Sequence, residues 1–138
     1  MSDLYGAMTI SAHGMKVQSQ RVRVISENMA NASTAGATPG EDPYTRKTIT
    51  FKNEMDKKAG MDLVNVDKIE DDKVRPYVLK YNPEHPAADI KGYVKMPNID
   101  PIIETMDMRE AQRSYEANLG MIDQSKSMIM QTIDLLRR

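Results

Sequence analysis

Two histidines and one acidic run are the side chains in this sequence whose types could support metal binding or acid–base catalysis. His13 and His85 lie far apart in the chain, and neither lies in an HxxxH or HExxH spacing. The consecutive acids Glu70, Asp71 and Asp72 could hold a divalent cation weakly. Because lysines flank them, the run is more typical of a solvent-facing turn. We therefore expect no metal site.

Hydroxyl side chains offer no better basis for catalysis. Ser33, Thr34 and Thr38 are nucleophiles in principle, but no residue near them could act as a base or orient one. Phosphate-binding glycine patterns are absent from the sequence. We expect no catalytic residue and no cofactor. A metal-assisted hydrolase stays the enzymatic alternative, and its turnover would depend on His13 or His85.

Composition narrows the class of protein further. The 138 residues carry 19 basic and 20 acidic side chains, so the net charge of −1 gives no sign of nucleic-acid binding. The absence of cysteine excludes disulfides and thiolate zinc sites. The apolar residues are unusual in composition, because they include twelve methionines but one Phe and no Trp. Methionine either fills a core here or adapts helices to several different neighbours.

The first ten residues lack the basic region and the apolar segment of a secretory signal. No stretch approaches the ~20 apolar residues that a membrane span needs. We expect either a cytosolic protein or one exported without a cleaved signal.

A heptad pattern predicts a long N-terminal helix from about Leu4 to Asn31, within a first segment of residues 1–32. Its seam is formed by Leu4, Met8, Ser11, Met15, Gln18, Val22, Ile25, Met29 and Ala32. Asp3 is the expected N-cap. The two polar seam residues, Ser11 and Gln18, are expected to set the register of helix pairing.

The C-terminal segment, residues 100–138, predicts a second long amphipathic helix over 102–138, with Asp100 as N-cap and Pro101 at its first position. One apolar stripe recurs every seven residues at Met108, Tyr115, Ile122, Ile129 and Leu136. A second stripe runs one position earlier at Met121, Met128 and Leu135. So wide an apolar arc needs neighbours on at least two sides, and we expect some of them in other molecules.

Between the helices, residues 33–43 predict a linker loop rich in small residues, Gly and Pro, and residues 44–99 predict a β-rich insertion. Candidate strands cover 44–51, 61–66, 76–81 and 92–96. The predicted fold is mainly α. Segments 1–32 and 100–138 form one helical domain as an antiparallel coiled coil, with the small β-rich insertion between them.

Several motifs carry a resemblance to a known family. They are Ile25–Gly36 (ISENMANASTAG), Pro43–Lys47 (PYTRK), Tyr81–Pro83 (YNP), Gly92–Ile99 (GYVKMPNI) and Ser114–Asn118 (SYEAN). Together they resemble the bacterial flagellar rod and hook axial proteins, and within that family the proximal rod subunits of the basal body. The signature residues are Asn28, Ala30, Asn31, Gly92, Tyr93, Pro97 and Asn98. Glu27 departs from the small or uncharged residue usual in the signature.

The resemblance implies a structural role without enzymatic activity. Such subunits pass unfolded through the flagellar type III export apparatus, without a cleaved signal. They assemble into a helical tube that crosses the periplasm, forms part of the export channel wall, transmits torque and is needed for motility. The implied partners are further copies of this chain, other proximal and distal rod proteins, and the adaptor between rod and membrane ring.

Within this hypothesis, Met8, Met15, Val22 and Met29 pack on the C-terminal helix of the same subunit, whereas Met121, Met128 and Leu135 face the next subunit. Two alternatives stay open. One is another rod subunit of the same family. The other, from a different class, is a cytosolic helical adaptor or export chaperone, which would form a discrete dimer inside the cell.

Overall fold

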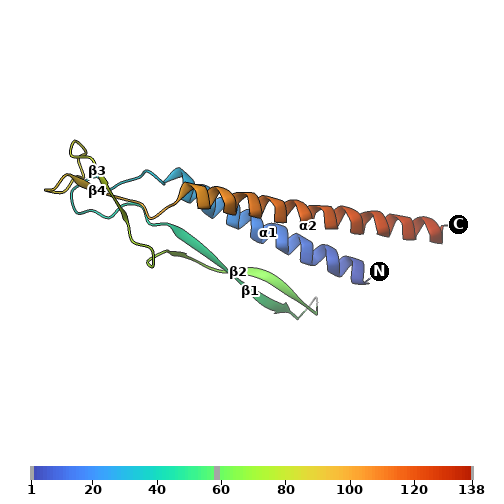
Figure 1. Cartoon of the computed structure of the whole chain (residues 1–138). Coiled ribbons are helices and arrows are strands. Elements are labelled where there is room, and N and C mark those ends of the chain that lie inside the picture. Colours follow the sequence, from blue (N-terminus) through green and yellow to red (C-terminus); the bar gives the residue numbers. More distant parts are fainter. Residues whose placement is uncertain (1, 58–59, 138) are drawn as a thin grey trace. The chain divides into compact units, whose positions relative to one another are not determined.

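The computed structural model describes residues 2–57 and 60–137. Two long helices enclose a small β insertion, as the sequence predicts, and Figure 1 labels the elements. In chain order they are α1 (Ser2–Ala30), β1 (Lys47–Asp56), β2 (Met61–Asp71), β3 (Val78–Tyr81), β4 (Tyr93–Met96) and α2 (Pro101–Leu136). The strands form two sheets of two strands each, β1 with β2 and β3 with β4.

The helix ends follow local chemistry. Pro101 is the first residue of α2, and the Asp100 carboxylate accepts a hydrogen bond of 2.9 Å from the Ile102 N–H, which confirms the predicted N-cap. The prediction for Asp3 is wrong, because α1 begins at Ser2 and Asp3 lies in its first turn. At the other end, the Glu27 carbonyl accepts two hydrogen bonds from Asn31, one from its backbone N–H at 3.2 Å and one from its side-chain amide at 2.8 Å.

The β1–β2 hairpin is longer than the sequence predicts. Glu70 and Asp71 belong to β2, so their assignment to a turn is wrong. The pairing continues this far because the Thr48 hydroxyl donates to the Glu70 carbonyl at 3.2 Å, and the Asp72 N–H donates to the Arg46 carbonyl at 2.7 Å. Residues 58–59, between β1 and β2, lie outside the described part of the chain.

The described contacts divide the chain into two compact units. The first comprises Met1–Val22, Thr50–Lys68 and Arg109–Arg138, and the second comprises Arg23–Ile49 and Ile69–Met108. Each unit therefore takes part of both helices and part of the β1–β2 hairpin. The division into one helical domain and a separate β insertion stays a prediction.

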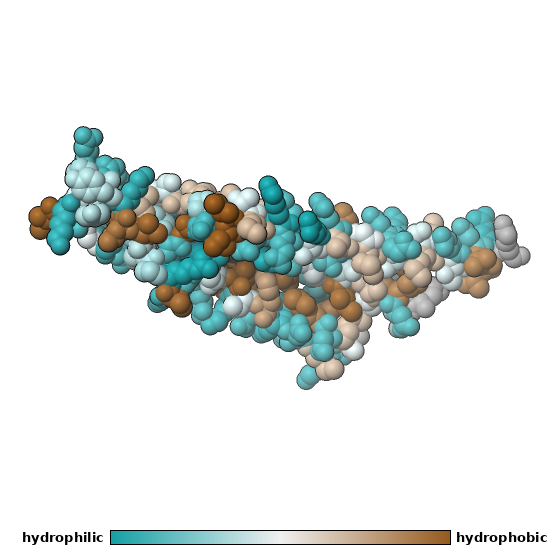
Figure 2. Space-filling model, in the orientation of Figure 1, coloured by the Kyte–Doolittle hydropathy of each residue, from teal (hydrophilic) through white to brown (hydrophobic). Residues whose placement is uncertain are grey.

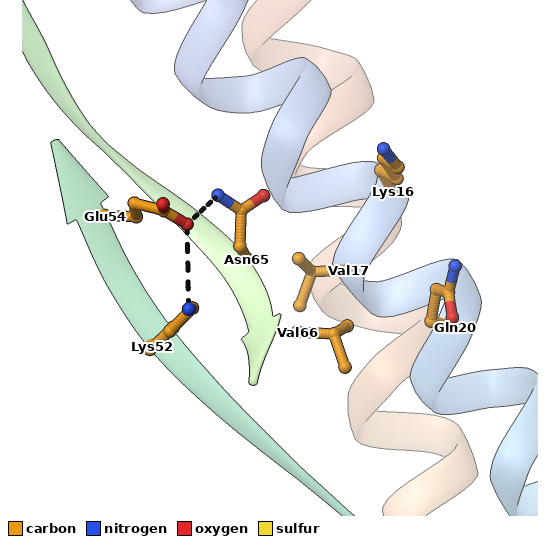
Figure 3. A pocket seen from close by; sticks show the side chains of 7 residues that line it. All are labelled: Lys16, Val17, Gln20, Lys52, Glu54, Asn65 and Val66. Carbon is orange, nitrogen blue, oxygen red and sulfur yellow. Dashed lines mark hydrogen bonds and ion pairs between the residues drawn. The ribbon is translucent and has the colours of Figure 1, made fainter. Parts of the chain in front are cut away.

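In the first unit, α1 packs against both β2 and α2. Val17 of α1 is buried and points toward Val66 of β2, beside the linked polar side chains of the hairpin (Figure 3). On another side of α1, the helices come so close at Gly14 that a Cβ there would lie 2.9 Å from the Asn118 amide. Farther along, Arg21 forms an ion pair of 3.6 Å with Glu110.

The linker loop before β1 is held by one carboxylate. Glu41 accepts hydrogen bonds from the backbone N–H groups of Ala37 at 2.9 Å and Thr38 at 3.2 Å, and these bonds hold its pKa below the usual 4.5. A lowered folded-state pKa gives stabilisation that is present above pH 4.5 and is lost as the pH falls through the folded-state value.

We therefore expect the Glu41 carboxyl signal to titrate below pH 4.5 in an NMR pH titration, together with the Ala37 and Thr38 amide signals. Glu41→Gln is the control, because it keeps an acceptor oxygen without a titrating charge and its loop amides should not respond. Loop amides of the unaltered chain that stay constant through the Glu41 titration would contradict the assignment.

Candidate assembly surface and its polar anchor

The side-chain amides of Asn28 and Asn98 form hydrogen bonds with backbone N–H and C=O groups at the ends of the β1–β2 hairpin. Asn28 sits in the last turn of α1, donates to the Lys47 carbonyl and accepts from the Lys47 N–H, both at 2.9 Å. Asn98 accepts from the Arg46 N–H at 2.8 Å and donates to the Asp72 carbonyl at 2.8 Å. Both side chains are buried, where each unmade hydrogen bond would cost ~1–3 kcal/mol.

Glu104, in the first turn of α2, is fully buried and joins the same cluster. One of its oxygens accepts from Arg46 Nε at 2.6 Å, and the other accepts from the Asn28 amide at 3.2 Å. The Arg46 guanidinium also lies 3.7 Å from Asp72 and 3.8 Å from Asp107. Three carboxylates therefore surround one largely buried arginine.

We call Asn28, Arg46, Asp72, Asn98 and Glu104 the polar anchor; all five lie in the second unit. The anchor joins the end of α1, the entry into β1, the exit from β2 and the start of α2. It therefore holds together the four segments that meet in the second unit.

The sequence predicted this cluster only in part. Asn28 and Asn98 are named as signature residues, but their buried role is not apparent from the pattern. The interpretation of Asp72 as part of a solvated turn is wrong, because its carboxylate is largely buried and lies near Arg46 and Arg75, with Arg75 Nε at 3.7 Å. Glu104 could not have been found from its residue type, because an acidic residue is usual in the first turn of an exposed helix. Only the fold buries it.

An exposed ion pair lies beside the anchor. Lys47 Nζ donates to Glu27 at 3.1 Å, and this bond, together with the one from Arg23, lowers the pKa of Glu27. The Glu27 carboxylate in turn raises the pKa of Lys47. Glu27 is the residue that departs from the family signature, and here its carboxylate forms ion pairs with Lys47 and Arg23. Burial is the main cause that raises the pKa of Tyr44, whose hydroxyl donates to Asn28 Oδ1 at 3.2 Å.

The predicted outward stripe of α2 is exposed in the described chain. Met121, Met128 and Leu135 leave between 44 and 73% of their surface accessible, and Leu136, the last residue of the other stripe, leaves 76%. Met130 and Ile133 on the same helix are also exposed. Figure 2 shows such hydrophobic side chains in brown among hydrophilic ones on the face it draws. Exposed large apolar side chains that recur along one helix in this way are typical of an interaction site.

The other residues predicted to form helix contacts are less exposed to solvent. Met8, Met15, Val22, Met108, Ile122 and Ile129 are partly buried, whereas Met29 and Tyr115 stand near the exposed limit at 39 and 37%. Of the register residues, Ser11 is buried and Gln18 is partly buried, with its Oε1 unpaired. Which stripe meets which neighbour stays a prediction.

The remaining signature residues shape the chain near the anchor. Ala30 ends α1, Pro97 is fully buried beside Asn98, and Tyr93 packs its ring edge-on against Tyr81 with centroids 5.3 Å apart. The Asn31 side-chain amide donates to the Glu27 carbonyl near the end of α1.

The two histidines show no catalytic arrangement. His85 Nδ1 accepts from the Ala87 N–H at 3.1 Å within a turn, and His13 Nδ1 is buried without a partner. Among residues 2–57 and 60–137, no group of three His, Asp or Glu side chains could hold a metal ion. Within the same residues, no helix has the length and apolar content to cross a membrane.

The backbone conformation at Gly92, near the anchor, can be tested by substitution. Its φ is +80°, and a Cβ there would lie 2.9 Å from the Tyr81 ring and 3.1 Å from Pro83. Gly92→Ala should lower the free energy of unfolding by at least ~1–2 kcal/mol, the cost of the left-handed conformation alone. Urea unfolding of the purified chain measures this cost.

The matched control is Gly120→Ala, because Gly120 lies inside α2 and a Cβ there would meet nothing within 4 Å. It should raise the stability by ~0.5–1 kcal/mol. Equal effects of the two substitutions would contradict the assigned backbone at Gly92.

Comparisons with known proteins place these features in one family. The family model described as "Flagella basal body rod protein" matches residues 8–38, and the model "Flagellar basal body rod FlgEFG protein C-terminal" matches residues 90–135. The flagellar basal-body rod protein FlgC of Agrobacterium fabrum is 50% identical over 137 residues, covering 99% of this chain and 98% of that protein.

Other proteins of that name are similar over the same extent. The one from Borreliella burgdorferi is 37% identical and covers 97% of this chain and 98% of its own length. The one from Salmonella typhimurium is 33% identical and covers 96% of this chain and 97% of its own length.

Proposed function

The chain belongs to the flagellar basal-body rod protein family, and from this premise we propose that it is a structural subunit of the proximal rod of the bacterial flagellum. As a rod subunit it serves motility. The observation that carries the proposal is the exposed apolar stripe of α2, which a single chain leaves uncovered and a helical assembly would bury.

We further propose that α1 and α2 pair as an antiparallel coiled coil. Two contacts within the first unit support this pairing, because they run in opposite chain order: Gly14 approaches Asn118, and Arg21 approaches Glu110. Small and polar residues are buried on both helices of this unit, among them Ser11, Ala111 and Ser125. Residues of this kind permit close approach of two helices and favour one register over others.

The assembly we propose is a tube in which each subunit contacts the next through two different surfaces. Such a heterologous contact repeats without closing and generates a helical array. Met121, Met128 and Leu135 would contact the neighbouring subunit, and many packed contacts would carry torque. In this proposal the tube wall forms part of the export channel.

The proposed partners are further copies, other proximal and distal rod proteins, the adaptor to the membrane ring and the flagellar type III export apparatus. The proposed location is the rod where it crosses the periplasm, reached without a cleaved signal. A sister rod subunit is the near alternative. A cytosolic adaptor or export chaperone is the distant one, and it would stay in the cell as a discrete dimer.

Deletion of the gene tests the function. We expect loss of swimming and of complete rods, both restored by the unaltered chain, and we expect the chain to copurify with basal bodies. A deletion strain that builds complete rods would contradict the proposal. Recovery of the chain only in the cytosol, as a dimer, would favour the adaptor.

A further inference from the structure

The turn between β3 and β4 presents an isoleucine to solvent. Ile90 is fully exposed, and Lys91 beside it is exposed as well. We call residues 89–92 the tip. An aliphatic side chain standing alone at a turn is not unusual, but the way in which this turn is held makes it a stiff projection.

Hydrogen bonds fix the tip from both sides. The Asp89 carboxylate accepts from the N–H groups of Lys91 and Tyr93, each at 2.8 Å. The Gly92 N–H donates to the Asp89 carbonyl, and the Asn82 N–H donates to the Gly92 carbonyl, both at 2.9 Å. A side chain presented by so ordered a turn loses little conformational entropy when it docks.

The same unit carries a hollow of complementary chemistry. It measures about 590 Å³, and its apolar wall comes from exposed Ile69 and Val74. The polar wall comes from Thr48, Glu70, Asp71, Asp72 and Lys73. The Asp72 carboxylate already lies near Arg46 and Arg75, so Glu70 and Asp71 carry the acidic character of this hollow beside the Lys73 ammonium. This acidic hollow favours an aliphatic side chain that is followed by a cation. The tip provides that combination.

We propose that the tip of one copy docks in the acidic hollow of a neighbouring copy, with Ile90 against Ile69 and Val74 and with the Lys91 ammonium beside Glu70 and Asp71. This inference rests on the proposed function, because it needs an assembly in which copies meet. Ile90 is fully exposed in the single chain, so it is not seated in the hollow of its own chain. Two different surfaces of one chain then form a repeating heterologous contact.

The sequence has no cysteine, so disulfide cross-linking can test the contact without removing native thiols. One strain should produce two variants together, Ile90→Cys and Val74→Cys. A disulfide forms only where the two Cβ atoms come within ~3.5–4.5 Å. After mild oxidation of purified basal bodies, we expect a dimer band that reduction removes. Each variant alone should give no dimer, because the contact is heterologous.

The matched control replaces Ile90→Cys with Val78→Cys, since Val78 is also an exposed aliphatic residue of this sheet. An equal dimer yield from the control would overturn the proposal. So would the absence of a dimer when both variants are present in rods and the cells swim, and in that case the rod function would stand. Absence of the unaltered chain from rods would overturn both.

A charge reversal gives an independent readout. Lys91→Glu should reduce swimming and incorporation into rods, and Asp71→Lys in the same chain should restore them in part, because the ion pair is re-formed with opposite signs. Failure of the second substitution to restore any incorporation would overturn the placement of Lys91 beside Asp71.

Discussion

Replacing Glu104 with alanine should lower the free energy of unfolding by about 3–5 kcal/mol, the cost of breaking a buried ion pair by removing one partner. Glu104 is fully buried, and its loss would leave the Arg46 guanidinium without its nearest carboxylate and the Asn28 amide with one fewer acceptor. Asp72 and Asp107 remain 3.7 and 3.8 Å from Arg46, which favours the lower part of that range. Urea unfolding followed by circular dichroism measures the change.

Two further variants separate charge from general damage to the helix. Glu104→Gln keeps the shape and one acceptor oxygen, so its cost should fall between those of the unaltered chain and Glu104→Ala. Glu110→Ala removes an exposed carboxylate from its ion pair with Arg21 and should cost only ~0–1 kcal/mol. If Glu104→Ala proves no more destabilising than Glu110→Ala, the polar anchor does not hold the chain together.

Placing a charge in the outward stripe of α2 should abolish rod assembly while leaving the single chain folded. Met128 is exposed, so Met128→Glu should change the unfolding free energy by no more than ~0.5 kcal/mol. In an assembled tube the same carboxylate would be buried without a partner, at a cost of several kcal/mol. We expect non-swimming cells that still produce and export the chain.

The control for this prediction is Ser127→Glu. Ser127 is exposed and lies four residues after Asp123 and seven before Asp134, so the added charge joins a polar side of the helix. Its repulsion with Asp123 should cost only ~0.2–0.5 kcal/mol. Swimming should be retained. Normal rods built from the Met128→Glu variant would show that this stripe does not face a neighbouring subunit.

The helices could be predicted from the sequence because their signals are local. Seven-residue periodicity, together with the Asp100–Pro101 start, is sufficient to locate α2. The hairpin could be predicted only in part, because the second half of β1 and the second half of β2 are mostly exposed. An alternation of buried and exposed residues cannot be followed there. There the pairing depends on hydrogen bonds between strands, which leave little trace in residue type.

The polar anchor could not be derived from the sequence for a different reason. Its hydrogen bonds join residues that are far apart in the sequence. Asn28 and Lys47 are 19 residues apart, Arg46 and Glu104 are 58 apart, and Asn28 and Glu104 are 76 apart. Each residue alone has the type of a surface side chain, and only the fold makes it buried and paired. The family resemblance marked Asn28 and Asn98 as notable without giving their role.

The most direct test of the central claim is a cryo-electron microscopy map of basal bodies purified from cells that produce this chain and from cells that lack its gene. We predict density for its two paired helices in the proximal rod, with the apolar stripe of α2 against a neighbouring subunit, and no rod in the deletion. A complete rod in the deletion, or a rod whose density does not fit α1 and α2, would contradict the account.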